Sequence, residues 1–202
     1  MKNKFLTLWT VLLVAAVMTS TASAGGNVRL SALEFSLGSL ETPLTLAAVS
    51  QSLSFSLTAT GTFTGLGGYG EGVTVELTAS GDPVVTCTNQ GGNESPGQNP
   101  PKVTAGDIQE IPFDLITKKG TAPLNVTAEP APITGTQGGC PNDNCTAKIV
   151  SLAWIYAEVD GYDNANGQLV LHNEYYCYPA PRPGHPDAYA CTLIPELSYN
   201  VH

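Results

Sequence analysis

The stretch "TAKIVSLAWIYAEVDGYDNANGQLVLHNEYYCY", residues 146–178, decides the fold. Its two arms, 146–159 and 168–178, are long and rich in apolar, β-branched and aromatic residues. The segment between them consists of turn formers and includes Asn166-Gly167. Asn-Gly between two such runs is a strong local signal for a β-hairpin. The stretch therefore predicts two long, paired antiparallel strands.

Other parts of the chain repeat the same period of two. Apolar residues alternate with polar ones in 52–59 and in 72–79, and convincing helix patterns are lacking after residue 24. The alternating residues are Leu53, Phe55, Leu57 and Ala59 in the first run and Val73, Val75, Leu77 and Ala79 in the second. These patterns predict an all-β fold, specifically an antiparallel, immunoglobulin-like β-sandwich, with a closed barrel as the alternative.

Three further runs refine this fold. In 27–38 the apolar phase shifts near Ala32, which indicates a bulge or bend. The runs 107–115 and 122–130 contain or touch prolines, which suits strands at the edge of a sheet. We therefore expect a bulged strand near the start of the domain and two edge strands in its middle.

The two ends of the chain predict export and a tail. Residues 1–24 combine Lys2 and Lys4, an apolar run over 5–18 and a small-residue site at 22–24, the order of a cleaved secretory signal peptide. We expect a β-sandwich domain over 25–178 and an irregular, proline-rich, disulfide-tied tail over 179–202. The mature chain should be secreted and extracellular, with no membrane span after signal cleavage.

Charge narrows the classes of partner. The chain carries a formal net charge of −9, and only 12% of its residues are charged. An acidic chain repels phosphate backbones, so nucleic-acid binding is not expected. The weakly charged composition is typical of secreted β proteins.

The segment "VVTCTNQGGNESPGQNPPKV", residues 84–103, is rich in turn formers and nearly uncharged. It combines a strand ending in Cys-Thr-Asn, a Gly-Gly-Asn turn and a Pro-Gly-x-Asn-Pro segment, and a Cys-Pro-Asn follows at 140–142. With these motifs, residues 73–150 resemble a group of small secreted bacterial proteins of uncharacterised function. The resemblance implies an exported bacterial protein and a Cys87–Cys140 disulfide. It implies no activity.

Five cysteines follow the signal sequence: Cys87, Cys140, Cys145, Cys177 and Cys191. In an oxidising compartment they should form disulfides. Zinc is the alternative, because a Cys-x4-Cys knuckle is present, but no second knuckle follows it. Spacing alone does not determine the connectivity. The bridge that the resemblance implies would make residues 87–102 a clamped scaffold turn. Beside it we favour Cys177–Cys191, which leaves Cys145 free.

Aromatic residues of the late hairpin are weak candidates for stacking on a sugar: Trp154, Tyr162, Tyr175 and Tyr176. Strict alternation would place Trp154 and Tyr156 on one face of their strand, which favours a core or cross-strand aromatic ladder for that pair. His172 and Glu174 should also share a face, which we interpret as a polar outer surface.

Two kinds of chemical site lack a supporting pattern. No nucleophile motif accompanies His172. The turn at 160–167 offers oxygen ligands for calcium, but the EF-hand pattern fails and turn propensity explains the same residues. We expect no catalytic residue, no metal site and no cofactor.

The function that the sequence predicts is a secreted, non-enzymatic structural, adhesive or binding module with an unidentified surface or extracellular partner. A polysaccharide is one candidate for that partner. The alternative is a secreted carbohydrate-binding or hydrolytic protein that uses the aromatic hairpin.

Overall fold

The late hairpin forms as two long strands, β7 (Thr146–Asp163) and β8 (Leu169–Pro179), in a computed structural model that describes residues 27–37, 55–180 and 188–200. The expected signal peptide lies outside the described residues. The other strands are β1 (Arg29–Leu37), β2 (Leu57–Thr64), β3 (Val73–Thr88), β4 (Glu94–Pro96), β5 (Val103–Ile111), β6 (Ala122–Ala128), β9 (Ala188–Leu193) and β10 (Tyr199–Asn200). Three short 3-10 turns accompany them: η1 (Leu66–Gly68), η2 (Phe113–Leu115) and η3 (Pro195–Leu197).

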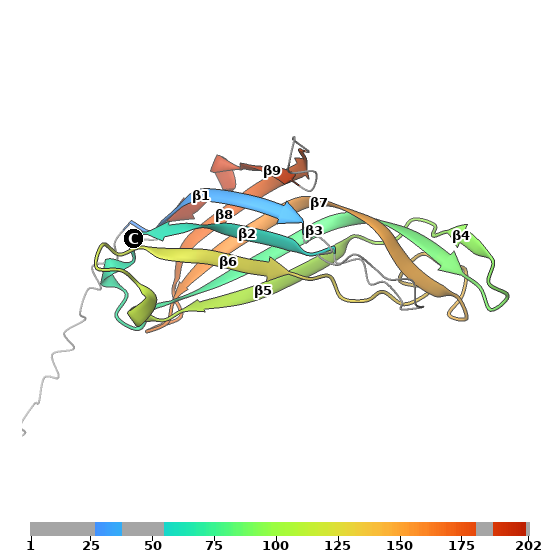
Figure 1. The fold of residues 1–202 in the computed structure, drawn as a ribbon, viewed down its shortest axis with the longest axis horizontal. Coiled ribbons are helices and arrows are strands. Elements are labelled where there is room, and N and C mark those ends of the chain that lie inside the picture. Colours follow the sequence, from blue (N-terminus) through green and yellow to red (C-terminus); the bar gives the residue numbers. More distant parts are fainter. Residues whose placement is uncertain (1–26, 38–54, 181–187, 201–202) are drawn as a thin grey trace, which may run out of the picture.

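The strands form one antiparallel sheet that is curled into a half-barrel (Figure 1). Its order is β4-β3-β7-β8-β9-β1-β2-β6, with β5 paired to β3 and β10 paired to β8. The prediction of an all-β fold is confirmed. The immunoglobulin-like sandwich is not confirmed. The strand β9 pairs with both β8 and β1, so it joins what would otherwise be two sheets into one.

The strand β9 corrects the expectation of an irregular tail over 179–202. Residues 188–193 continue the ladder of β8, with Cys177 directly opposite Cys191, and these two cysteines form a disulfide. The local sequence "AYACTL" suits a strand, and the surrounding prolines obscured it.

The strands β5 and β6 lie side by side where the curled sheet comes back toward itself (Figure 1). The side-chain amide of Gln109 on β5 bridges them. Its Oε1 accepts a hydrogen bond of 2.8 Å from the N–H of Asn125, and its Nε2 donates one of 3.3 Å to the carbonyl of Pro123. As their prolines predicted, β5 and β6 are edge strands: among the described strands, β5 pairs in the ladder only with β3, and β6 only with β2.

The core fills the inside of the curl. Trp154 is completely buried there, and its Nε1–H donates a 3.0 Å hydrogen bond to the carbonyl of Phe55. The other large, fully buried side chains of this core are Val28, Leu57, Phe63, Leu66, Val73, Val75, Leu77, Ile111, Val126, Val159 and Leu171. The alternation of 72–79 is therefore confirmed, as is the bulge of β1, whose register with β2 shifts between Ser31 and Glu34.

The far halves of β3 and β7 run past the curl as a long arm that carries β4 (Figure 1). A small second core of Val85, Cys87, Cys140 and Cys145 lies in this arm. Cys87 and Cys140 form a disulfide with 5.6 Å between their Cα atoms, and the Asn89 carboxamide accepts hydrogen bonds from the backbone N–H groups of Gly91 and Asn93. The segment therefore has the clamped turn that the sequence predicted.

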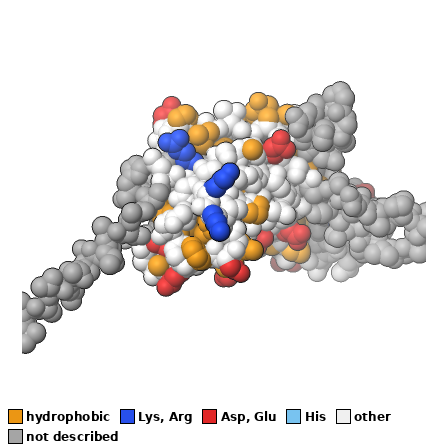
Figure 2. Space-filling view, turned by 60° about the vertical axis from the view of Figure 1, so that its left-hand side comes forward, with side chains coloured by type: hydrophobic (Ala, Val, Ile, Leu, Met, Phe, Trp, Pro, Cys, Tyr) orange, Lys and Arg blue, Asp and Glu red, His pale blue; other side chains and the backbone are white. Residues whose placement is uncertain are grey.

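Figure 2 shows one face of the molecule, on which few basic and acidic side chains are scattered among neutral ones, in keeping with the 12% of charged residues in the sequence. None of the helical segments that the structure describes is long and apolar enough to cross a membrane.

Candidate functional site

The candidate site lies on the outer face of the β7–β8 hairpin, opposite the core. Ala157 and Val159 of β7 point inward, so the residues between and beside them point outward. Cross-strand pairing sets Asp160 opposite His172 and Glu158 opposite Glu174. We call the eight side chains on this face the outer-face array: Tyr156, Glu158, Asp160 and Tyr162 of β7, with His172, Glu174, Tyr176 and Tyr178 of β8.

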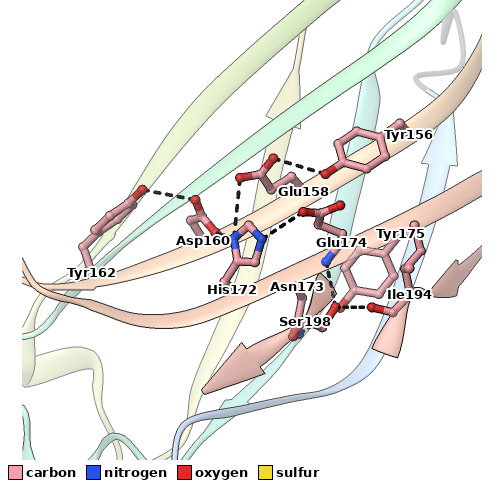
Figure 3. Close-up of polar contacts among 10 residues, drawn as sticks. All are labelled: Tyr156, Glu158, Asp160, Tyr162, His172, Asn173, Glu174, Tyr175, Ile194 and Ser198. Atoms are coloured by element: carbon pink, nitrogen blue, oxygen red, sulfur yellow. Dashed lines mark hydrogen bonds and ion pairs between the residues drawn. The ribbon is translucent and has the colours of Figure 1, made fainter. Parts of the chain in front are cut away.

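His172 is at the centre of the array, between carboxylates on both of its ring nitrogens (Figure 3). Its Nδ1 is 2.7 Å from Oδ1 of Asp160 and 3.6 Å from Oε1 of Glu158, and its Nε2 is 3.1 Å from Oε1 of Glu174. Ionised carboxylates only accept hydrogen bonds, so a ring that bonds to all of them donates from both nitrogens. This arrangement favours the imidazolium form.

Protonation equilibria in the array follow from these contacts. Partial burial lowers the pKa of His172, but the hydrogen bonds to Asp160 and Glu174 outweigh it, so the pKa is raised overall. Burial and the charge of Asp160 raise the pKa of Glu158. Hydrogen bonds from Tyr156 and His172 lower the pKa of Glu174 despite some desolvation. Glu158 and Glu174 face each other across the ladder, and their pKa values are therefore shifted in opposite directions.

Tyrosines flank the charged centre, the group formed by Glu158, Asp160, His172 and Glu174, on both sides. The hydroxyl of Tyr162 donates a 3.1 Å hydrogen bond to Oδ2 of Asp160, and that of Tyr156 donates one of 3.4 Å to Oε2 of Glu158. Burial and Asp160 raise the pKa of Tyr162 to about 12, so it remains a donor. Farther along β8, Tyr176 and Tyr178 are 55% and 45% exposed, with ring centroids 6.4 Å apart. The array thus presents two open aromatic rings beside a row of carboxylates.

The C-terminal segment holds β8 from its other side. The backbone N–H of Glu174 donates to Oγ of Ser198 at 3.0 Å, and the Ser198 hydroxyl donates to the carbonyl of Ile194 at 2.9 Å (Figure 3). The backbone of Tyr199 on β10 pairs opposite His172. These contacts keep the strand that carries His172 and Glu174 in place.

The structure separates the four aromatic residues that the sequence singled out. Trp154 is in the core, and Tyr175 is 7% exposed with its ring edge-on to Phe35 at 5.3 Å. Tyr162 and Tyr176 are on the outer face. Only the latter two belong to the candidate site.

The expectation that Trp154 and Tyr156 share a face is wrong. The register between β3 and β7 shifts at this point, with Gly81 opposite Trp154 and Ser80 opposite Tyr156, which leaves Ile155 as an extra residue. Such a bulge reverses the alternation beyond it. Trp154 therefore points inward and Tyr156 outward.

Sequence reasoning missed the charged centre. It recognised that His172 and Glu174 share a face, but it assigned Asp160 to the turn and did not consider Glu158. Two i, i+2 pairs, Glu-x-Asp on one arm and His-x-Glu on the other, were the available signal. They meet only in one register of the hairpin, which the sequence alone does not reveal.

Within the part of the chain that the structure describes, Glu158, Asp160 and His172 form the group that could hold a metal ion. Each offers one ligand atom, and the three atoms lie within 4.8 Å of one another.

The oxygens of the calcium-candidate turn are engaged elsewhere. Oδ1 of Asp163 accepts from the N–H of Ala165, and Oδ1 of Asn166 accepts from that of Gln168. Oδ1 of Asn164 accepts a 2.7 Å hydrogen bond from the hydroxyl of Thr74. The first two are bonds of an ordinary turn, and the third joins the turn to β3.

The two disulfides are the pairs favoured from the sequence, and Cys145 has a free, buried thiol. Its Sγ is 3.5 Å from Oδ1 of Asn142, beside a polar cavity of about 270 Å³ in the arm. The cavity is lined by Asn89, Gln90, Gly91, Asn142, Asn144 and Cys145. The amides in this lining are very weak acids and bases, so the Cys145 thiol is the lining side chain that could transfer a proton.

Comparisons of the chain with models of protein families, with curated proteins and with solved structures found no significant match.

Proposed function

We propose that the chain is a secreted, non-enzymatic binding module that binds a polysaccharide with the outer face of β7 and β8. The observation that carries the proposal is the outer-face array, in which the open rings of Tyr176 and Tyr178 lie beside Glu158, Asp160 and Glu174. Aromatic faces pack on the apolar faces of sugar rings, and carboxylates accept hydrogen bonds from sugar hydroxyls. Two disulfides support export, because they persist in oxidising compartments.

The proposal is tested by replacing the two open rings. Co-sedimentation with insoluble polysaccharides and calorimetry with soluble ones would compare the wild type with the double variant Tyr176→Ala/Tyr178→Ala. We expect the variant to bind about tenfold more weakly or worse, since each aromatic contact contributes about 0.5–1.5 kcal/mol. Phe113→Ala is the matched control, because Phe113 is 54% exposed but belongs to η2 and not to the outer-face array.

Two outcomes of this experiment contradict the proposal. One is a wild-type protein that binds none of a broad polysaccharide panel. The other is binding that Phe113→Ala weakens as much as the double variant does.

A second candidate, glycoside hydrolysis, is favoured by one observation. Glu158, whose pKa is raised, faces Glu174, whose pKa is lowered. A protonated acid beside an ionised carboxylate is the pairing that such hydrolysis uses. The test is the release of new reducing ends from a polysaccharide. If the wild type releases them and Glu158→Gln and Glu174→Gln each abolish the release, the protein is a glycoside hydrolase and not a binding module.

A further inference from the structure

We propose that Glu158, Asp160 and His172 bind one divalent transition-metal ion of the zinc class on the outer face of the β7–β8 hairpin. The ligand atoms are one carboxylate oxygen from each acid and Nδ1 of the imidazole. This inference does not depend on polysaccharide binding.

The geometry of the three ligand atoms is close to what such an ion requires. Nδ1 of His172 is 2.7 Å from Oδ1 of Asp160 and 3.6 Å from Oε1 of Glu158. Tetrahedral zinc with bonds of about 2.0–2.1 Å separates its ligand atoms by about 3.4 Å. The two distances from Nδ1 lie on either side of this separation, and all three ligand atoms lie within 4.8 Å of one another, so small rotations of the side chains suffice. All three residues stand on two paired strands rather than on a loop, which keeps the site rigid.

Each ligand also has an outer partner that orients it. Nε2 of His172 is 3.1 Å from Oε1 of Glu174, so the nitrogen that does not bind the ion donates to a carboxylate. The second oxygens of Asp160 and Glu158 accept from the hydroxyls of Tyr162 and Tyr156 (Figure 3). A histidine ligand held by a carboxylate, with the ligating carboxylates themselves hydrogen-bonded, is the usual outer shell of metal sites in proteins.

The local charge favours a dication. Glu158, Asp160 and Glu174 surround one imidazole, and Glu76 of β3 pairs opposite Asp160 from the next strand. The side chains of Asp160 and His172 are only 13% and 14% exposed. Attraction between the ion and these carboxylates is therefore weakened less by water than on an open surface.

The donor set selects the class of ion. Calcium takes six to eight oxygen ligands, whereas one imidazole with two carboxylates is a typical set for zinc and its neighbours. Three protein ligands also leave a fourth position for water or another molecule.

The test is calorimetric titration of the full mature protein, freed of metal by a chelator, with ZnCl₂. We expect one site in the wild type. Removal of a ligand in His172→Ala or in Asp160→Asn should weaken binding more than 100-fold, and Glu174→Gln should weaken it about 10–100-fold through the outer shell. Glu76→Gln is the matched control: it removes an equal charge from the same face but no ligand, and it should keep the wild-type stoichiometry and bind within about tenfold of wild type.

The free cysteine and the two other histidines of the chain are alternative ligands for zinc. The triple variant Cys145→Ser/His185→Ala/His202→Ala removes them and should bind zinc as the wild type does. Far-UV circular dichroism of each variant establishes that it is folded. The proposal is overturned if the wild type binds no zinc, if folded Asp160→Asn binds as the wild type does, if the triple variant loses the site, or if CaCl₂ binds more tightly than ZnCl₂ at this position.

Discussion

Nδ1 of His172 lies 2.7 Å from Oδ1 of Asp160, across the ladder that joins β8 to β7. It is the shortest contact that the ring makes with the three surrounding carboxylates, and it places a titrating group between the two strands of the hairpin. The protonation state of His172 is thereby linked to the stability of the sheet.

The first prediction concerns pH in the metal-free protein. The pKa of His172 is raised above 6.5 in the folded state, so the folded chain binds this proton more tightly than the unfolded chain does. The resulting stabilisation is complete below pH 6.5 and is lost as the pH rises through the folded pKa. NMR titration of the imidazole should give a midpoint above 6.5 in the wild type and a lower one in Asp160→Asn. A wild-type midpoint below 6.5 would contradict this account.

A second prediction ranks the disulfides. Cys87–Cys140 spans 53 residues of sequence and Cys177–Cys191 spans 14. Closing the longer loop should stabilise the fold by about 4 kcal/mol and the shorter by about 3 kcal/mol, because the longer one restricts the unfolded chain more. Guanidinium unfolding of Cys87→Ser/Cys140→Ser and of Cys177→Ser/Cys191→Ser measures both. The reverse ranking would show that loop closure does not govern these bridges.

Trp154 gives the third prediction. Its Nε1–H bonds to the carbonyl of Phe55 inside the core. Trp154→Phe leaves that carbonyl without its donor and opens a small cavity, so we expect a loss of about 2–4 kcal/mol in the free energy of unfolding. If residues 1–24 are removed, Trp154 is the one remaining tryptophan. Its fluorescence should then be blue-shifted in the native protein and shift to the red on unfolding, and native emission already at the red position would contradict burial.

The fourth prediction tests the bulge of β7. A Cβ at Gly81 would lie 2.5 Å from the carbonyl oxygen of Ala153 and 3.0 Å from Cα of Trp154, both backbone atoms that cannot move aside cheaply. Gly81→Ala should therefore lower the free energy of unfolding by about 1–3 kcal/mol. Gly70→Ala is the control, because nothing lies within 4 Å of a Cβ there. Thermal unfolding compares the two, and equal melting temperatures would argue against the close approach.

Much of the fold was predictable because it depends on local alternation. The strands around Val75 and around the late hairpin follow a period of two that burial imposes on any half-buried strand. The phase shift at Ala32 predicted the bulge of β1, and the prolines in or next to β5 and β6 predicted two edge strands. These features were predictable because each has a local steric cause.

The rest depends on contacts between distant residues. The bulge at Ile155 carries no proline and no glycine of its own, because the glycine that permits it, Gly81, is on the partner strand. Pairing of β9 with both β8 and β1 decides between one sheet and two, and no local pattern encodes it. The charged centre around His172 depends on the observed register between β7 and β8. If one strand slipped by one residue, the members of the centre would lie on opposite faces of the sheet.

The bridge made by the Gln109 carboxamide has a consequence for solubility. A bare edge strand offers unpaired N–H and C=O groups to other chains and so nucleates aggregation. Here β5 and β6 turn toward one another, and the amide of Gln109 occupies the N–H of Asn125 and the carbonyl of Pro123. One neutral side chain of β5 thus withdraws part of the β6 edge from intermolecular strand addition. For a chain with as few charged residues as this one, such shielding replaces part of the electrostatic repulsion that keeps other proteins apart.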